Sequence, residues 1–158
     1  MTPELSVIIP VYNEASIVES AGSELAQGLD ERKLDYEIIF AENGSRDSTP
    51  QILQAMCEKN PRMRWFHSET PNYGAALKRG INEARGELVV CDEIDLCDLL
   101  FYDRSLPMLK NRSVDMVVGT RPRRVPPTSG RWFAGWRPGC TTGCSRWRSI
   151  FRGPTPMG

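Results

Sequence analysis

The sequence lacks several features that would place it in common classes of protein. Its 158 residues contain no run of about 18 apolar residues, so no membrane-spanning helix is expected. No basic region followed by a long apolar stretch begins the chain, which predicts that there is no signal peptide. Five cysteines without framework spacing argue against a disulfide scaffold. These absences predict a cytoplasmic protein, with peripheral attachment at the inner face of a membrane left open.

Acidic residues and lysines are missing from the C-terminal part. After Asp115 there is no Asp, Glu or Lys, although this part holds eight arginines. The part up to Asp115 carries all 20 acidic residues. Such a sharp division of charge indicates two segments of different character.

Apolar runs alternate with amphipathic stretches along most of the chain. Short runs rich in β-branched residues predict buried strands, which fall at residues 5–11, 36–41, 63–67, 88–91 and 114–119. Apolar residues at helical spacing predict helices after Asn13, Thr49 and Asn72, and a fourth around Pro107. This alternation predicts an α/β fold, a mostly parallel sheet with helices on both faces. Ligands bind such sheets at the carboxyl ends of the strands.

Four carboxylates follow the predicted strand 88–91, namely Asp92, Glu93, Asp95 and Asp98. Carboxylates crowded together repel one another unless a cation neutralises them. A divalent cation bound together with a diphosphate fits this chemistry, since Mg²⁺ takes one or two carboxylates plus phosphate oxygens. The alternative is a solvated acidic loop in which Asp98 caps a helix.

Two further segments lie where strands end. Glu42 and Asn43 begin a polar stretch suited to hydrogen bonding with a base or ribose, although a turn and helix cap need the same residue types. Asn72 and Gly74 begin a helix whose small residues allow a ligand to approach the backbone, or simply allow tight packing. His67 has no neighbour at metal-ligand spacing and is interpreted as a strand-end residue.

Four segments, taken together and in this order, resemble family 2 glycosyltransferases. They are SVIIPVYNE at 6–14, AENGSRDST at 41–49, NYGAALKRGI at 72–81 and GELVVCDEIDL at 86–96. The string VVGTR at 117–121 also looks like polyprenyl-phosphate sugar synthases of the dolichol-phosphate mannose synthase type. The resemblance implies a glycosyltransferase A-type (GT-A) fold with a Rossmann-like nucleotide-binding half at residues 1–121, acting as a hexosyltransferase.

The resemblance also implies roles for individual residues. It implies a nucleotide-sugar donor, with Asn43 reading the base, and Mg²⁺ or Mn²⁺ held by Asp95 with Glu93. Glu93 stands where the family has an aspartate, so Asp92 is a further candidate ligand. The residues implied to bind the nucleotide sugar are Pro10, Tyr12, Glu14, Glu42, Asn43, Asn72 and Gly74.

The resemblance stops after Arg121. Residues 122–158 are rich in Arg, Pro, Gly and Trp, and they are expected to be an irregular tail outside the fold. The hypothesis is that the family domain is truncated here and that the tail is out-of-frame translation, because a shifted reading frame of a GC-rich gene yields this composition. A basic, aromatic tail on an anionic membrane surface is the alternative. A nucleic-acid-binding tail is the third reading, and no nucleic-acid partner is expected.

The tail offers no carboxylate as a general base, so no catalytic residue is identified. A polyprenyl phosphate is already ionised and needs no base, which favours a lipid phosphate acceptor. Two alternatives are an inactive remnant that binds nucleotide sugar and a nucleotidyltransferase. The latter would carry a glycine-rich loop after the first strand, where PVYNE stands.

Overall fold

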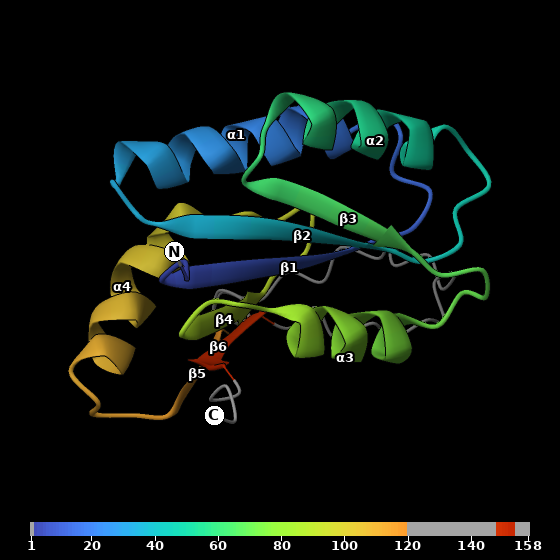
Figure 1. Ribbon diagram of the computed structural model, residues 1–158. Coiled ribbons are helices and arrows are strands. Elements are labelled where there is room, and N and C mark those ends of the chain that lie inside the picture. Colours follow the sequence, from blue (N-terminus) through green and yellow to red (C-terminus); the bar gives the residue numbers. More distant parts are fainter. Residues whose placement is uncertain (1, 120–147, 154–158) are drawn as a thin grey trace, which may run out of the picture.

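The computed structural model describes residues 2–119 and 148–153, which form one six-stranded sheet with four helices (Figure 1). The strands are β1 (Leu5–Val11), β2 (Tyr36–Glu42), β3 (Met63–His67), β4 (Leu88–Cys91), β5 (Met116–Gly119) and β6 (Arg148–Arg152). The helices are α1 (Val18–Glu31), α2 (Thr49–Lys59), α3 (Tyr73–Glu83) and α4 (Leu99–Lys110). No helix of the described residues is long and apolar enough to cross a membrane.

The sheet is mostly parallel, as the sequence predicts. Its strand order is β3-β2-β1-β4-β6-β5, and β1 pairs in parallel with both β2 and β4. Strand β3 continues the parallel arrangement on β2. Among the strands of the described residues, only β6 runs antiparallel, between β4 and β5. The predicted α/β fold class is confirmed.

Strand β6 departs from the expectation that everything after residue 121 lies outside the fold. Ile150 is fully buried and pairs with Val90 on one side and Val117 on the other. The next residue, Phe151, points to the opposite face and packs against a second apolar cluster. Residues 120–147 and 154–158 lie outside the described residues, so the boundary at residue 121 and the origin of the tail stay predictions.

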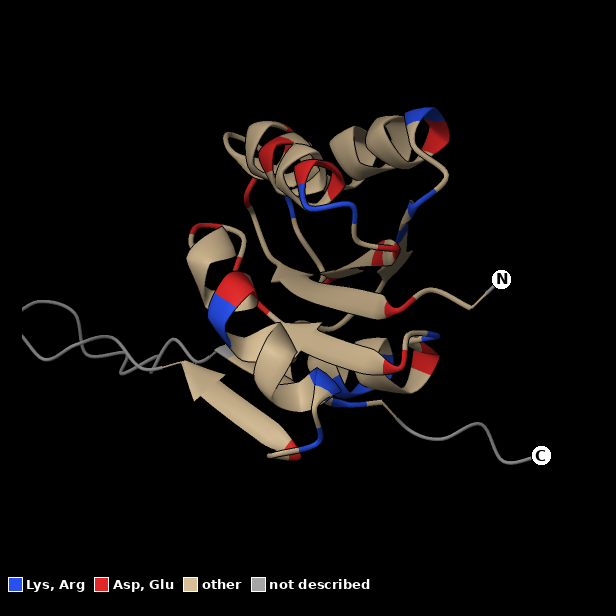
Figure 2. Ribbon diagram, turned by 90° about the vertical axis from the view of Figure 1, so that its left-hand side faces the viewer, with Lys and Arg blue, Asp and Glu red and all other residues tan. Residues whose placement is uncertain are grey.

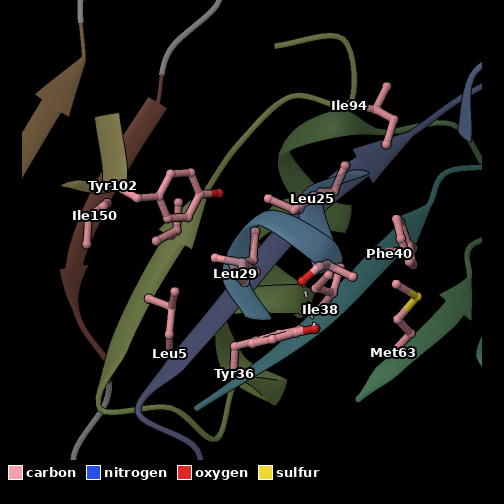
Figure 3. Close-up of a cluster of buried hydrophobic side chains, with 14 of the residues drawn as sticks. Leu5, Leu25, Leu29, Tyr36, Ile38, Phe40, Met63, Ile94, Tyr102 and Ile150 are labelled. Atoms are coloured by element: carbon pink, nitrogen blue, oxygen red, sulfur yellow. Dashed lines mark hydrogen bonds between the residues drawn. The ribbon is translucent and has the colours of Figure 1, made fainter. Parts of the chain in front are cut away.

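Two apolar clusters cover the two faces of the sheet. Alternate side chains of each strand belong to different clusters, because successive residues of a strand point to opposite faces. In β1, Val7 and Ile9 pack toward α1, α2 and α4, whereas Ile8 packs toward α3. Figure 1 shows α1 and α2 on one side of the sheet and α3 on the other. Figure 3 shows the larger cluster, where Leu25 and Leu29 of α1 lie over the sheet.

Helix α3 packs directly against β1 through a glycine. A Cβ atom at Gly80 would lie 2.5 Å from Ile8 Cγ2, closer than nonbonded carbon atoms approach. Gly74, in the first turn of the same helix, has only Asn72 Oδ1 nearby, at 3.8 Å. Gly80 therefore permits close packing of the helix on the sheet, whereas Gly74 has open space around it.

The amino end of the sheet holds a buried carboxylate. Glu37 is 7% exposed and accepts hydrogen bonds from the Ser6 hydroxyl at 2.6 Å and the Arg85 backbone amide at 2.8 Å. Arg64 Nε donates to its second oxygen at 3.0 Å. Burial alone would raise the pKa of Glu37, but these three donors outweigh it and hold the pKa below its ordinary value.

The helix starts agree with the sequence at three places and differ at one. Asn72 caps α3 by accepting from the Ala75 amide at 3.0 Å, and α2 begins at Thr49. Asp98 caps α4, which continues through Pro107. The helix predicted after Asn13 is not capped by this residue, because α1 begins only at Val18 and has no side-chain cap. Asn13 adopts a positive φ of 55° and bonds to a neighbouring loop instead.

Candidate functional site

The predicted binding residues gather at the carboxyl ends of the parallel strands. From β1, the chain proceeds to β2 and β3 on one side, while β4 lies on the other side of β1. The strand order therefore reverses between β1 and β4, and the loops that leave their ends diverge there. Open α/β sheets bind ligands at such a switch point.

The loops after β1 and β2 are tied together by hydrogen bonds. The backbone amide of Asn13 donates to Ser45 Oγ at 2.9 Å, and the amide of Arg46 donates to Asn13 Oδ1 at 2.8 Å. Two residues further on, the Ala15 amide donates to Asp47 at 3.1 Å. A hydrogen bond from the Thr49 hydroxyl holds the pKa of Asp47 below its ordinary value. Asp47 is therefore charged at neutral pH and fixes the two loops to each other.

Asn43 links the second loop to the start of α3. Its side chain is nearly buried, and its Oδ1 accepts the backbone amide of Asn72 at 2.7 Å. A backbone N–H can only donate, so the atom that faces it must be the amide oxygen. What Asn43 still has to offer a ligand is therefore chiefly its Nδ2 donors.

The acidic segment after β4 divides in two directions. Asp92 is 1% exposed and accepts the Tyr102 hydroxyl at 3.0 Å and the Glu93 amide at 2.9 Å. Glu93 turns toward α3, where the Tyr73 hydroxyl donates to its Oε1 at 2.7 Å. Asp95 is exposed and lines a groove of about 410 Å³ beside α1. Asp92 thus lies behind the surface, while Glu93 and Asp95 lie nearer to solvent.

A cation at this segment would have to be shared with a ligand. Among the residues that the structure describes, no group of three His, Cys, Asp or Glu side chains could hold a metal ion alone. One or two carboxylates suffice for Mg²⁺ when phosphate oxygens and water complete its coordination. Asp95 and Glu93 are the more accessible carboxylates for this purpose, because Asp92 is buried.

The remaining predicted residues differ in exposure. Tyr12 is 43% exposed and Gly74 is exposed, so both are open to a ligand. Pro10 is buried within β1, beyond the last pairing of β1 with β4, which joins Ile8 to Cys91. Its missing N–H therefore costs no ladder hydrogen bond on that side. Glu14 is half-buried.

Several residues of the site were not recognised in the sequence. Tyr73 and Tyr102 bind the acidic segment, and His67 faces Glu42. The signal for His67 is the strand register, which places it opposite Glu42 on β3. Burial raises the pKa of the Cys91 thiol to about 11, which leaves it protonated and unsuited to act as a nucleophile.

The fold and the loop geometry define an α/β domain whose candidate site lies at a topological switch point. Residues 6–152 match the family described as glycosyl transferase family 2, a match that also spans β6. The chain belongs to this family, and the resemblance seen in its motifs is confirmed.

Related proteins carry glycosyltransferase names. The chain is 32% identical over 128 residues to "Glycosyltransferase AglD" of Haloferax volcanii, covering 77% of this chain and 20% of that protein. It is 33% identical over 134 residues to an undecaprenyl-phosphate 4-deoxy-4-formamido-L-arabinose transferase of Pseudomonas aeruginosa, covering 81% of this chain and 38% of that protein. The chain therefore spans well under half the length of these relatives.

A solved structure supports the glycosyltransferase A-type fold. The mannosyltransferase PcManGT from Pyrobaculum calidifontis, in complex with GDP-Man and Mn²⁺, matches with a TM-score of 0.62 and 25% identity. The match covers 78% of this chain and 37% of that protein. The predicted GT-A architecture is thereby confirmed.

Proposed function

We propose that this chain forms the donor-binding part of a glycosyltransferase that takes its sugar from a nucleoside diphosphate sugar. The observation that carries the proposal is the meeting of three family motifs at the carboxyl ends of β1, β2 and β4. Hydrogen bonds join the first two loops and link the second to α3. The likeness to a mannosyltransferase bound to GDP-Man supports the same kind of donor.

Each loop has its own part in binding. Asn43, whose oxygen is already engaged, offers N–H donors to an acceptor on the base. Tyr12 and Glu14 line the nucleotide, and Glu42 supports it from behind. Asn72 and Gly74 place the start of α3 beside it, where exposed backbone amides favour an anion.

Asp95, together with Glu93, would hold a divalent cation on the diphosphate, with Asp92 fixing the loop that carries them. Such a cation, Mg²⁺ or Mn²⁺, neutralises the charge that develops on the departing nucleoside diphosphate. The Tyr73 hydroxyl restrains Glu93 and thus limits the positions its carboxylate can take.

The acceptor we propose is a polyprenyl phosphate. Its phosphate is a nucleophile without deprotonation, so the transfer needs no general base to activate the acceptor. The name of the Pseudomonas aeruginosa relative supports this acceptor class. It would place the protein in the cytoplasm at the inner face of a membrane, with no nucleic-acid partner.

Calorimetric titration of the purified chain with GDP and with UDP tests the proposal. Binding is expected with Mn²⁺ or Mg²⁺, weakened by EDTA and weakened at least tenfold in Asp95→Ala. Asp115→Ala, an exposed aspartate at the far edge of the sheet, is the matched control and should bind as the wild type does. If the folded wild-type chain binds neither nucleotide, the alternative of an inactive remnant that keeps the family fold is favoured.

A further inference from the structure

A buried carboxylate stands directly behind the candidate nucleotide site. Glu42, the last residue of β2, is 0% exposed. One of its oxygens accepts the Ser45 backbone amide at 2.5 Å, and the other faces Nδ1 of His67. A side chain with no exposed surface cannot touch a ligand, so its influence on binding must pass through the groups that it holds.

Glu42 holds the turn formed by residues 43–45. Gly44 has a φ of 78°, and a Cβ there would lie 3.1 Å from the Ser68 backbone oxygen and from Pro71 Cδ. The turn is thus pressed against the segment that follows His67. Burial alone would raise the pKa of Glu42, but hydrogen bonds from Ser45 and His67 keep it below its ordinary value. The carboxylate is therefore charged and serves as a fixed acceptor.

The turn at residues 43–45 also fixes the neighbouring groups that face the candidate site. Asn43 begins it and bonds to the start of α3, while Ser45 Oγ accepts the Asn13 amide of the first loop. A displacement of the turn would therefore disturb both neighbouring loops at once.

His67 reaches this buried carboxylate from the surface. Its side chain is 48% exposed, and the strand register places it opposite Glu42. From α3, Arg79 donates to the His67 backbone oxygen at 3.1 Å and pairs with Glu83 at 2.7 Å. Glu42 on β2 therefore faces the imidazole, and the Arg79–Glu83 pair of α3 is tied to the His67 backbone. A carboxylate only accepts when ionised, so Nδ1 carries the proton of this contact.

We propose that Glu42 and His67 form a positioning pair that orients the turn 43–45 for nucleotide binding. Neither residue touches the nucleotide. His67 keeps the Glu42 carboxylate aligned with the Ser45 amide, and the turn then presents Asn43 to the base. This proposal rests on the proposed function.

Two substitutions of His67 separate the hydrogen bond from the shape of the ring. In His67→Asn, the side-chain amide places an N–H donor near the position of Nδ1, whereas His67→Phe keeps a ring without a donor. We expect His67→Asn to bind GDP or UDP within about twofold of the wild type. His67→Phe should bind about tenfold more weakly, the scale of one hydrogen bond to a charged group. His67→Phe binding as tightly as the wild type would overturn the proposal.

The chain offers a second readout that needs no substitution. His67 is its sole histidine, so ¹⁵N labelling of histidine gives one set of imidazole signals. We expect Nδ1 to carry a proton, with imidazole signals that shift when the nucleotide is added. Nucleotide binding that leaves these signals unmoved contradicts the proposal but leaves the proposed function intact. Wild-type chain that binds no nucleotide contradicts both.

Discussion

The charge of the two buried carboxylates at opposite ends of β2 depends on the hydrogen-bond donors around them. Glu37 at the amino end and Glu42 at the carboxyl end are both nearly inaccessible, and both keep a pKa below the ordinary value. Each does so because hydrogen-bond donors outweigh the cost of burial. Stability gained in this way is present above the ordinary carboxyl pKa and is lost as pH falls through the folded-state value.

Replacing Glu37 by Gln should therefore destabilise the protein in a pH-dependent way. The new amide would direct a donor at Ser6 or Arg64, both of which donate to this position. We expect a loss of about 1–3 kcal/mol at neutral pH, measured by urea unfolding, and a smaller difference in acid, where Glu37 itself is protonated. Glu19→Gln, an exposed glutamate on α1, is the control. A loss that does not vary with pH would contradict the electrostatic explanation.

The sequence places the candidate site residues at the ends of strands but does not predict their contacts. Asp92 and Asp95 both appear in one acidic run, yet the first is buried by the Tyr102 hydroxyl and the second is exposed. That difference depends on a helix residue ten positions later, which no local pattern indicates. The contact of His67 with Glu42 likewise depends on strand register.

At the scale of elements, α3 joins the packing of the sheet to the binding site. Gly80 lets the helix approach β1, and Gly74 lies in its first turn. Gly80→Ala should cost about 1–3 kcal/mol because its methyl group would overlap Ile8. Gly74→Ala should leave stability unchanged or raised by up to about 1 kcal/mol, since alanine favours helices.

Thermal or urea unfolding of the two variants measures this difference, and nucleotide titration adds a second test. If Gly74 permits close approach of the ligand, Gly74→Ala should weaken nucleotide binding while leaving the fold intact. Equal stability of the two variants would show that α3 can shift away from β1.

Strand β6 is an element that the sequence did not predict. Strands β1, β2 and β4 carry continuous apolar runs, such as VIIPV in β1, because these parallel strands are buried on both faces. In contrast, RSIFR offers only Ile150 and Phe151 between polar residues. Its place between β4 and β5 arises from pairing with distant residues, and no local period reveals it.

Ile150→Ala tests whether β6 is integral to the sheet. The side chain is fully buried, so its removal should cost about 2–5 kcal/mol in urea unfolding. Leu100→Ala, at a residue 59% exposed on α4, should change stability by no more than about 0.5 kcal/mol. If the two variants lose the same small amount, β6 contributes nothing to the stability of the sheet.

For the whole molecule, the distribution of charge and apolar surface bears on solubility. Figure 2 shows Asp, Glu, Lys and Arg gathered on the helices and at the ends of strands, while the strands themselves carry few of them. Strand β5 lies last in the strand order and exposes Met116 by 56% and Val118 by 41%. Exposed apolar side chains on an outer strand favour association with other chains.

We therefore expect the isolated chain to self-associate or to be only marginally stable. Val118→Lys should reduce the association measured by light scattering over a range of concentrations, without changing nucleotide affinity. Met108→Lys, at an exposed methionine of α4, should have a smaller effect. A monomeric wild-type chain with a cooperative thermal transition would contradict this expectation.

The position of β6 between β4 and β5 also determines the order in which the strands can pair during synthesis on the ribosome. Strands β1 to β4 pair with one another directly and can assemble as they appear. Strand β5 pairs with β6, and residues 120–147 must be synthesised before β6 begins. At roughly 5–20 residues per second, β5 waits on the order of one to six seconds for its partner. During that interval its apolar residues are open to chaperones and to neighbouring nascent chains.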